Sequence, residues 1–416
     1  MNQKIIKAFI LVGLFGFLSL LGIYIGAFWP DAECWRNWSL LIFKKGLPNA
    51  YTEWNNYMPF YQYVLYGYGK LMGTEARILH YTDILKSVTF LFDFVGLWFV
   101  YKWIDKKTDY LLLLLFSMFN LAYSYNSLIW GQVDGIYCTM TFMALYYAYK
   151  EKTVVSAFWF ILALNMKLQA IIFFPILGLI YLFNAAKNKS WLSLPYAIGL
   201  IAITQLVLLW PFISIPHGFD YFWKEVMAAS TIYPYVVMGA TNFWYFVVDN
   251  SLIEATDDAQ KFFAGVSYKQ AGLLLFMASS FAAMWPLLKC VWQRLVKGKG
   301  VSMVTAAQLW LMCSLVAILF FYFNTQMHER YSHPAFLFLT AYAFASRHFL
   351  AYIVFCFVYL VSLERVMKWA SLPSHTFIFD ARLIAALYAL LIAYLFYRLY
   401  EKPKDSAGLM AGTIKE

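Results

Sequence analysis

The sequence predicts an all-α, polytopic membrane protein whose 416 residues form a single domain. Hydrophobic residues account for 62% of the chain and charged residues for 13%, whereas soluble domains average roughly 45–50% and 25%. Burial capacity is limited by the surface-to-volume ratio, so a soluble globule could not hide this much apolar side chain. The composition therefore excludes a soluble enzyme, a disordered chain and a nucleic-acid-binding domain. The spacing of the apolar runs and the placement of the charges then predict the topology.

The first apolar run covers residues 10–29 and follows the short basic segment Met1–Lys7. At about 1.5 Å per residue, some twenty residues cross a hydrocarbon core of ~30 Å. The run ends in Trp29-Pro30-Asp31 rather than in a small-residue cleavage site. We therefore expect an uncleaved anchor with a cytoplasmic N-terminus.

Further apolar runs follow, which predicts about twelve spans, with a range of about 11–13. They lie near residues 82–101, 110–124, 135–149, 154–166, 169–184, 191–213, 270–288, 302–323, 332–345, 349–364 and 381–398. The short run 154–166 is interpreted as a half-span broken at Asn165 and Lys167, which a protein-lined cavity tolerates. Lys86 and Asp93 lie seven residues apart on one span and are a candidate buried pair.

Basic residues gather on one side of the predicted membrane. The segments assigned to that side hold 18 of the 32 lysines and arginines but 6 of the 22 acids. Short basic loops are typical of the cytoplasmic face, so both termini are expected there, and the net charge of +10 indicates orientation. The extracytoplasmic side receives two long segments, residues 30–81 and 214–269, which are rich in Trp, Tyr, Pro and Asn. We expect interfacial helices and the functional site there, with the first segment catalytic.

Asp31 is the first candidate for catalysis. Asp31, Trp35 and Trp38 share helical spacing, so one helix face would present a carboxylate beside two aromatic rings. Glu33 is the nearest second carboxylate. The alternative interpretation is that Asp31 is the N-cap of an interfacial helix.

Three further outer motifs carry amides and aromatic rings. Asn56 and Tyr57 lie in NNYMPF and suit contact with a sugar, although an aromatic belt at the membrane interface has the same composition. Gln132 and Asp134 lie in WGQVDG, whose glycines let the backbone approach closely; a polar turn is the alternative. Asn242, in ATNFW, is a candidate sugar contact from the second outer segment.

Cationic side chains occur in two motifs. Lys167 lies in NMKLQ with Gln169, and in lipid it would need a counter-ion or would snorkel to the headgroups. Arg330, in MHERY, offers a planar fork suited to phosphate oxygens, and His328 could donate a second contact. Glu329 is a candidate sugar contact, and an exposed polar loop is the alternative for this motif. The motif is not HExxH, so a zinc site is unsupported.

This set of residues beside lipid favours transfer of a hexose or pentose from a polyprenyl-phosphate sugar. The leaving group is a lipid phosphate, whose charge Lys167, His328 and Arg330 would stabilise. The acceptor hydroxyl, on a lipid, a glycan or a protein, needs one base, and Asp31 suits that role. The candidate sugar contacts are Trp35, Asn56, Tyr57, Gln132, Asp134, Gln169, Asn242 and Glu329.

At these motifs the sequence resembles the GT-C glycosyltransferases, most of all the bacterial relatives of the GPI mannosyltransferases and of the glucosyltransferases of N-glycan assembly. The resemblance runs from about Asp31 to Tyr331, and GQVDG and HERY are its most specific parts. It implies a polytopic fold in a bacterial inner membrane with an extracytoplasmic active site. It also implies a catalytic Asp that maps onto Asp31, a lipid-monophosphate donor and inversion at the anomeric carbon.

The sequence departs from that family at one position. Many members carry Glu-Asp, Asp-Asp or Asp-x-Asp, whereas Ala32 and Glu33 follow Asp31 here. We therefore predict Asp31 as the base without a cofactor, keep Glu33 as the alternative base, and do not favour a divalent metal. A flippase or transporter of lipid-linked sugars is the rival function, but the repeats expected for it are not visible. A scaffold would leave the clustering of polar motifs on one face unexplained.

Overall fold

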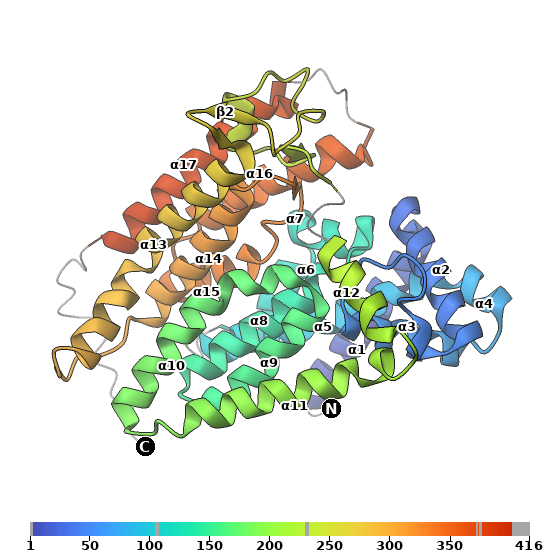
Figure 1. The fold of residues 1–416 in the computed structure, drawn as a ribbon, viewed down its shortest axis with the longest axis horizontal. Coiled ribbons are helices and arrows are strands. Elements are labelled where there is room, and N and C mark those ends of the chain that lie inside the picture. Colours follow the sequence, from blue (N-terminus) through green and yellow to red (C-terminus); the bar gives the residue numbers. More distant parts are fainter. Residues whose placement is uncertain (1–2, 105–107, 229–232, 372, 374–376, 402–416) are drawn as a thin grey trace.

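The computed structural model describes residues 3–104, 108–228, 233–371, 373 and 377–401. Within these residues the chain forms 17 α-helices and four strands of two or three residues each (Figure 1). The predicted all-α class is therefore confirmed.

Eight of the described helices are long and apolar enough to cross a membrane. They are α1 (Gln3–Ile25), α5 (Lys86–Trp103), α10 (Phe174–Asn188), α11 (Ser193–Ile213), α13 (Tyr268–Leu295), α14 (Ala306–Phe323), α16 (Leu350–Met367) and α17 (Ala381–Tyr400). α5 and α10 qualify together with the 3-10 turns η2 (Thr82–Leu85) and η4 (Leu168–Phe173) that precede them. A ninth span is a pair bent by 68°, formed by α6 (Tyr110–Met118) with α7 (Leu121–Ser124) and the π-helical turn η3 (Tyr125–Trp130).

Three predicted spans are short helices, namely α8 (Asp134–Tyr149), α9 (Thr153–Met166) and α15 (Ala335–Ser346). At 1.5 Å per residue they are roughly 24, 21 and 18 Å long, less than the ~30 Å hydrocarbon core. The number of full-length spans in the described chain is thus lower than the predicted 11–13. Polar residues limit these helices: α8 begins at Asp134, α9 ends just before Lys167, and α15 begins shortly after His333.

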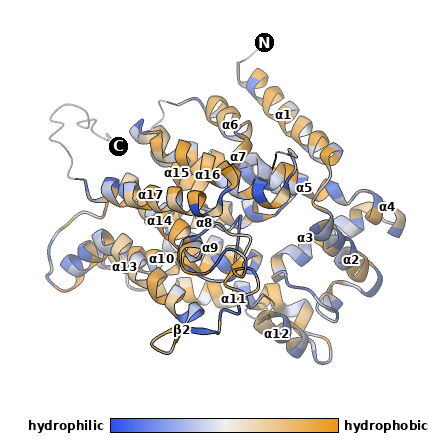
Figure 2. Cartoon of the chain, turned by 90° about the horizontal axis from the view of Figure 1, so that it is seen from above, coloured by the Kyte–Doolittle hydropathy of each residue, from blue (hydrophilic) through white to orange (hydrophobic). Residues whose placement is uncertain are grey.

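The helices differ in how much of their apolar surface the protein itself covers. In α11 only 11% of the apolar window is buried, and in α1 17%, whereas in α14 it is 72%. Figure 2 shows α1 as a mostly apolar segment at the periphery, and Figure 1 shows α11 along the lower edge of the molecule. Apolar surface that no protein atom covers would be costly in water, so α1 and α11 fit contact with lipid, and α14 lies in the protein core.

Loops that the charge count assigns to the cytoplasmic side contact one another. Lys7, near the start of α1, pairs with Asp109 before α6 at 2.6 Å. Lys187 pairs with Glu151 at 2.5 Å, and Arg294 donates to the Lys187 carbonyl oxygen at 3.4 Å. These contacts place loops from distant parts of the chain at the same end of the bundle, as the predicted topology requires.

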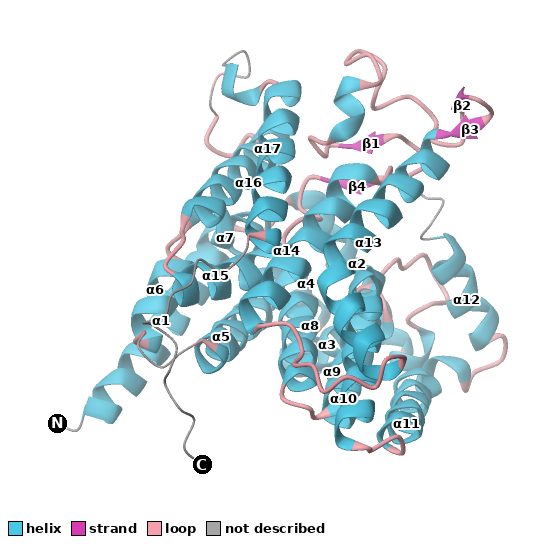
Figure 3. Ribbon diagram, turned by 90° about the vertical axis from the view of Figure 1, so that its left-hand side faces the viewer, coloured by secondary structure: helices cyan, strands magenta, loops and turns pink. Residues whose placement is uncertain are grey.

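The two long segments that the charge count predicts to be outer, residues 30–81 and 214–269, fold into α-helices of 6 to 17 residues and short strands. The first contains α2 (Trp29–Lys45), η1 (Leu47–Asn49), α3 (Pro59–Met72) and α4 (Glu75–His80); the second contains α12 (Gly218–Ala228), β1 (Val237–Met238), η5 (Phe243–Phe246), β2 (Lys261–Phe263) and β3 (Val266–Ser267). The remaining elements are β4 (Met327–His328), which follows α14, and η6 (Phe377–Phe379), which precedes α17. β1 pairs in parallel with β4, whereas β2 and β3 form a small antiparallel hairpin. Figure 3 shows β1 and β4 at the end of the bundle opposite the first residues of α1.

Candidate functional site

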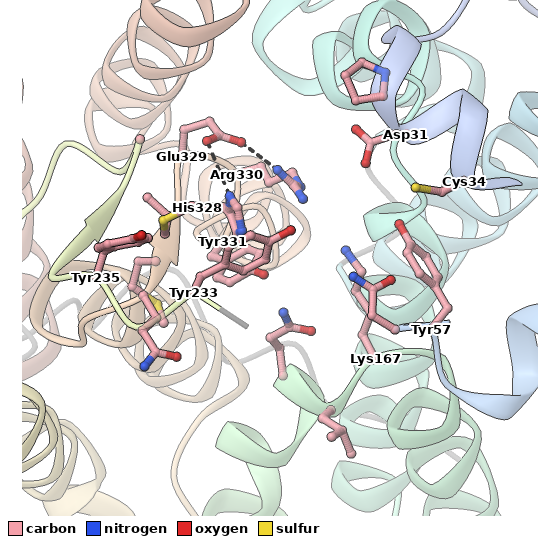
Figure 4. A pocket seen from close by; sticks show the side chains of 18 of the residues that line it. Asp31, Cys34, Tyr57, Lys167, Tyr233, Tyr235, His328, Glu329, Arg330 and Tyr331 are labelled. Atoms are coloured by element: carbon pink, nitrogen blue, oxygen red, sulfur yellow. Dashed lines mark hydrogen bonds and ion pairs between the residues drawn. The ribbon is translucent and has the colours of Figure 1, made fainter. Parts of the chain in front are cut away.

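A cavity with a volume of about 1400 Å³ is lined by residues of both segments that are predicted to be outer. Nine of the predicted site residues line it: Asp31, Trp35, Asn56, Tyr57, Lys167, Gln169, His328, Glu329 and Arg330. Figure 4 shows Asp31 and Lys167 on one side of the cavity and His328, Glu329 and Arg330 on the other. The fold therefore brings together motifs that are almost 300 residues apart in the sequence.

Asp31 lies in the first turn of α2, at the cavity wall. Its Oδ2 accepts hydrogen bonds from Trp130 Nε1 at 2.8 Å and from Gln132 Nε2 at 2.7 Å. Within the described chain its Oδ1 has no hydrogen-bond partner. The N-cap of α2 is Phe28, so the alternative in which Asp31 caps this helix is wrong, and Pro30 begins α2 rather than ending α1. One carboxylate oxygen is held in place and the other remains available.

A buried lysine fixes the elbow between α1 and α2. Lys86 Nζ donates to the carbonyl oxygens of Gly22 at 2.9 Å, Gly26 at 2.5 Å and Leu128 at 2.9 Å. Gly22 lies in the last turn of α1 and Gly26 directly follows the helix; the Gly22 carbonyl also accepts from the Gly26 backbone N–H at 3.1 Å. The third carbonyl belongs to η3, whose last residue, Trp130, holds Asp31. Lys86 therefore joins the two segments that position the carboxylate.

Asp93 does not pair with Lys86, contrary to the candidate pair inferred from their spacing. Its carboxylate accepts hydrogen bonds from the hydroxyls of Tyr123 at 3.0 Å and Ser127 at 2.9 Å. The second glycine of WGQVDG packs directly on this carboxylate, because a Cβ at Gly135 would lie 2.3 Å from Asp93 Oδ1. The glycine is thus required by close packing at the start of α8.

Replacing Gly135 with alanine is expected to destabilise the protein by about 1–3 kcal/mol, because an added methyl group in a packed core forces its neighbours apart. The matched control is Gly178→Ala in α10, where a new Cβ meets no heavy atom within 4 Å. That change should be neutral or stabilising by up to about 1 kcal/mol through helix propensity. Thermal unfolding in detergent measures both. Equal melting temperatures for the two variants would contradict the packing argument.

Lys167 and Arg330 both pair with carboxylates. Lys167 forms an ion pair with Asp134. Arg330 Nη1 lies 2.7 Å from Glu329 Oε1, and Arg330 Nε lies 3.7 Å from Asp134 Oδ2. The four side chains are between 2% and 12% exposed, so these attractions are screened far less than surface pairs. Asp134 itself does not line the cavity; it bridges the two cations from behind.

Burial sets the protonation of the two residues before Arg330. It raises the pKa of Glu329 above its ordinary value, although Arg330 opposes the shift. Burial, together with the charges of Arg330 and Lys167, lowers the pKa of His328 well below its ordinary value. His328 is therefore neutral near pH 7 and offers a hydrogen bond without a charge. The cationic part of the cavity near Asp31 consists of Lys167 and Arg330.

Four predicted site residues do not line the cavity: Gln132 and Asp134, whose contacts are given above, and Glu33 and Asn242. Glu33 lies 3.5 Å from Arg36 and its side chain is 44% exposed. Asn242 is buried and caps η5: its Oδ1 accepts from the Trp244 backbone N–H at 3.3 Å, and its amide donates to the carbonyl of Phe321 at 3.2 Å. The side chains of Glu33 and Asn242 thus make contacts within the protein, away from the cavity wall.

Three residues of the cavity wall each carry a buried polar atom that has no hydrogen-bond partner in the described chain. Trp35 Nε1, Asn56 Oδ1 and Arg330 Nε are buried and have no hydrogen-bond partner within the described residues. The Tyr57 hydroxyl donates to Gln132 Oε1 at 3.4 Å. Few buried polar atoms stay unpaired in native proteins, and eleven other such atoms of the described chain belong to residues away from the cavity wall. The described chain contains no cluster of three or more His, Cys, Asp or Glu side chains suited to a metal ion.

Several wall residues were not predicted from the sequence, among them Tyr235, Arg365 and Lys368. Trp130 belongs to a motif that was recognised, but its role as a donor to Asp31 depends on a contact 99 residues away. Arg365 and Lys368 end a predicted span, where basic residues are ordinary. A scan against protein-family models and a search of curated proteins found no match to this chain.

Proposed function

We propose that this protein is an integral membrane glycosyltransferase that moves a hexose or pentose from a polyprenyl-phosphate donor to a hydroxyl acceptor. One observation carries the proposal: Asp31, with one free carboxylate oxygen, shares a cavity with Lys167 and Arg330. The GT-C resemblance of the motifs that contain these residues supports the same function. The charge count predicts that the cavity lies on the extracytoplasmic side, and the donor's isoprenoid chain would lie in the bilayer.

The reaction uses few groups. The acceptor oxygen attacks the anomeric carbon as the bond from that carbon to the phosphate oxygen breaks, and the acceptor proton passes to Asp31. A single displacement of this kind inverts the anomeric carbon. The electron pair of the broken bond stays on the lipid phosphate, whose charge Lys167 and Arg330 stabilise in a site of low dielectric. No acid partner is needed, unlike glycoside hydrolysis, where two carboxylates act together.

The donor phosphate competes with residues already in the site. Arg330 is bound to Glu329, and Asp134 lies between Arg330 and Lys167. A phosphate that approaches Arg330 from the cavity side must weaken the contact of Arg330 with Glu329. Donor affinity therefore depends on the charge of Glu329.

Donor affinity is expected to rise as the pH falls from about 7 to about 5. The raised pKa of Glu329 means that acidification protonates this carboxyl earlier than an exposed one, and neutral Glu329 competes less for Arg330. The donor is a phosphodiester and keeps its single negative charge over this range. Equilibrium binding of a labelled polyprenyl-phosphate sugar measures the effect. Glu329→Gln should bind tightly at every pH, whereas Glu33→Gln should keep the wild-type pH slope; a steep slope in Glu329→Gln would contradict the model of competition.

The function itself is tested with purified protein in proteoliposomes supplied with polyprenyl-phosphate sugars and extracts of lipid, glycan and protein acceptors. Transfer predicts release of free polyprenyl phosphate together with a new glycosidic product identified by mass spectrometry. Movement of the intact donor between leaflets, without cleavage, would instead identify the flippase. If the protein neither cleaves nor moves any such donor, the proposal is wrong.

A further inference from the structure

A second pair of cations lines the cavity at the outer end of α16. Arg365 belongs to the last turn of this helix, and Lys368 follows it in the left-handed conformation, with φ of 52°. Both residues contribute to the cavity wall. Neither forms an ion pair with any acidic side chain of the described chain. They differ in this from Lys167 and Arg330, whose charges carboxylates already balance.

The nearest acid in the sequence is committed to other partners. The carboxylate of Glu364 accepts a hydrogen bond from the Tyr125 hydroxyl through one oxygen. Through the other it accepts from the backbone N–H of Ala370 at 2.8 Å. Both contacts hold the acid against the protein rather than against Arg365. Arg365 and Lys368 therefore have no direct ion-pair partner among the described residues.

Contacts within the protein compensate Arg365 only in part. Its guanidinium lies 5.4 Å from the ring centre of Tyr245, a cation–π contact that is weak where water has access. The C-terminal end of α16 adds a partial negative charge of roughly half a unit. These terms explain why a cation is tolerated here. They do not supply the full counter-charge that a half-buried cation and a neighbouring lysine would attract.

The position of this pair relative to Arg330 follows from a single glycine. A Cβ at Gly239 would lie 2.8 Å from Glu329 Oε2 on one side and 3.2 Å from Val366 Cγ2 on the other. Glu329 and the outer end of α16 therefore approach Gly239 from two directions, and Arg330 adjoins Glu329. The cavity wall carries two cationic positions with a carboxylate between them.

The two positions differ in their link to the proposed base. The Arg330 guanidinium lies 5.2 Å from the ring centre of Trp130, and the indole of Trp130 donates directly to Asp31. The donor's phosphate has to leave from a carbon close to that base, so it belongs at Arg330 and Lys167. A donor of this class has one phosphate. The cations on α16 are left for the other substrate.

We propose that Arg365 and Lys368 bind an anionic group, a phosphate or a carboxylate, carried by the acceptor. This inference rests on the proposed function and narrows its acceptor to a negatively charged molecule. The anionic group would hold the acceptor at the α16 side of the cavity while its hydroxyl reaches Asp31. An uncharged acceptor would leave this pair of cations without a partner.

The test measures binding of two anions to the whole protein in phosphatidylcholine nanodiscs. The protein is first saturated with a polyprenyl phosphate, and a water-soluble short-chain phosphatidic acid or inorganic phosphate is then titrated by calorimetry. We expect wild type to bind one further equivalent. The double variant Arg365→Gln, Lys368→Gln should bind that second ligand about tenfold more weakly or worse, since charged hydrogen bonds are lost. Its affinity for polyprenyl phosphate should not change, which also shows that it is folded.

Lys261→Gln is the matched control, because Lys261 is an exposed lysine of the second outer segment that does not line the cavity. It should bind both ligands like wild type. Tighter binding of phosphatidic acid than of inorganic phosphate supports a lipid-borne group, and equal binding supports a phosphate on a soluble or glycan acceptor. No second equivalent in wild type overturns the inference, as does a double variant that loses polyprenyl phosphate instead. Because the readout is binding, failure of sugar transfer in the proteoliposome assay is a separate result.

Discussion

Replacing Asp31 with asparagine is expected to lower sugar transfer by about 10²–10⁴-fold, the usual contribution of a general base. The amide oxygen can still accept hydrogen bonds from Trp130 and Gln132, so the side chain keeps its place at the wall. It cannot take the proton of the acceptor hydroxyl. Donor affinity should therefore stay unchanged while turnover falls. Release of polyprenyl phosphate in proteoliposomes measures turnover, and equilibrium binding measures donor affinity.

Glu33→Gln provides the control, because Glu33 lies only two residues away but contacts Arg36 and does not line the cavity. Its activity should equal that of wild type. If Glu33→Gln is inactive and Asp31→Asn is active, Glu33 rather than Asp31 is the base. Loss of donor binding in Asp31→Asn would show that Asp31 binds substrate rather than removing a proton.

Replacing Lys86 with methionine is expected to cost about 3 kcal/mol or more, because hydrogen bonds to a charged group contribute roughly 1.5–3 kcal/mol each. Three carbonyl oxygens would lose their donor together. Methionine fills similar space, so the loss would come from the ammonium group rather than from a cavity. The elbow between α1 and α2 would loosen, and transfer activity should fall with stability. Thermal unfolding and the transfer assay measure the two effects.

Lys102→Met on the same helix is the matched control. Lys102 is exposed near the other end of α5, and among the described residues its ammonium group lies over the rings of Trp98 and Phe99. A change there should stay within about 0.5 kcal/mol, as most surface substitutions do. If Lys86→Met melts at the same temperature as Lys102→Met, the ammonium group does not hold the elbow. Should Lys86→Met not accumulate, the melting temperature of Lys86→Arg, which keeps the charge but changes the geometry, gives the comparison.

The helices were predictable because the apolar runs reflect a solvent, the bilayer, that acts on every residue independently. Each of the twelve predicted runs coincides with a helix or a bent pair of helices. The apolar runs did not predict how long each helix is. α8, α9 and α15 are cut short by Asp134, Lys167 and His333, whose polar groups are satisfied only by partners from other parts of the chain.

The site was predictable where a residue's chemistry alone restricts its role, as for Asp31, Lys167 and Arg330, which all line the cavity. It was not predictable where the role depends on a distant partner. Asn242 has the composition of a sugar contact, yet the cap of η5 uses its side chain. Lys86 was expected to face Asp93, but three carbonyls from two other segments are closer.

The short ladder between β1 and β4 has a mechanical consequence. Val237 is in register with Met327, and Met238 with His328, so the backbone of the second outer segment is fastened to the chain just before Arg330. Because of this pairing, the second outer segment cannot move at Val237 and Met238 without moving the residues next to Arg330. A displacement of this segment that opens the cavity to the acceptor would therefore also move Arg330, which is proposed to bind the donor phosphate. Entry of one substrate and binding of the other would then be coupled.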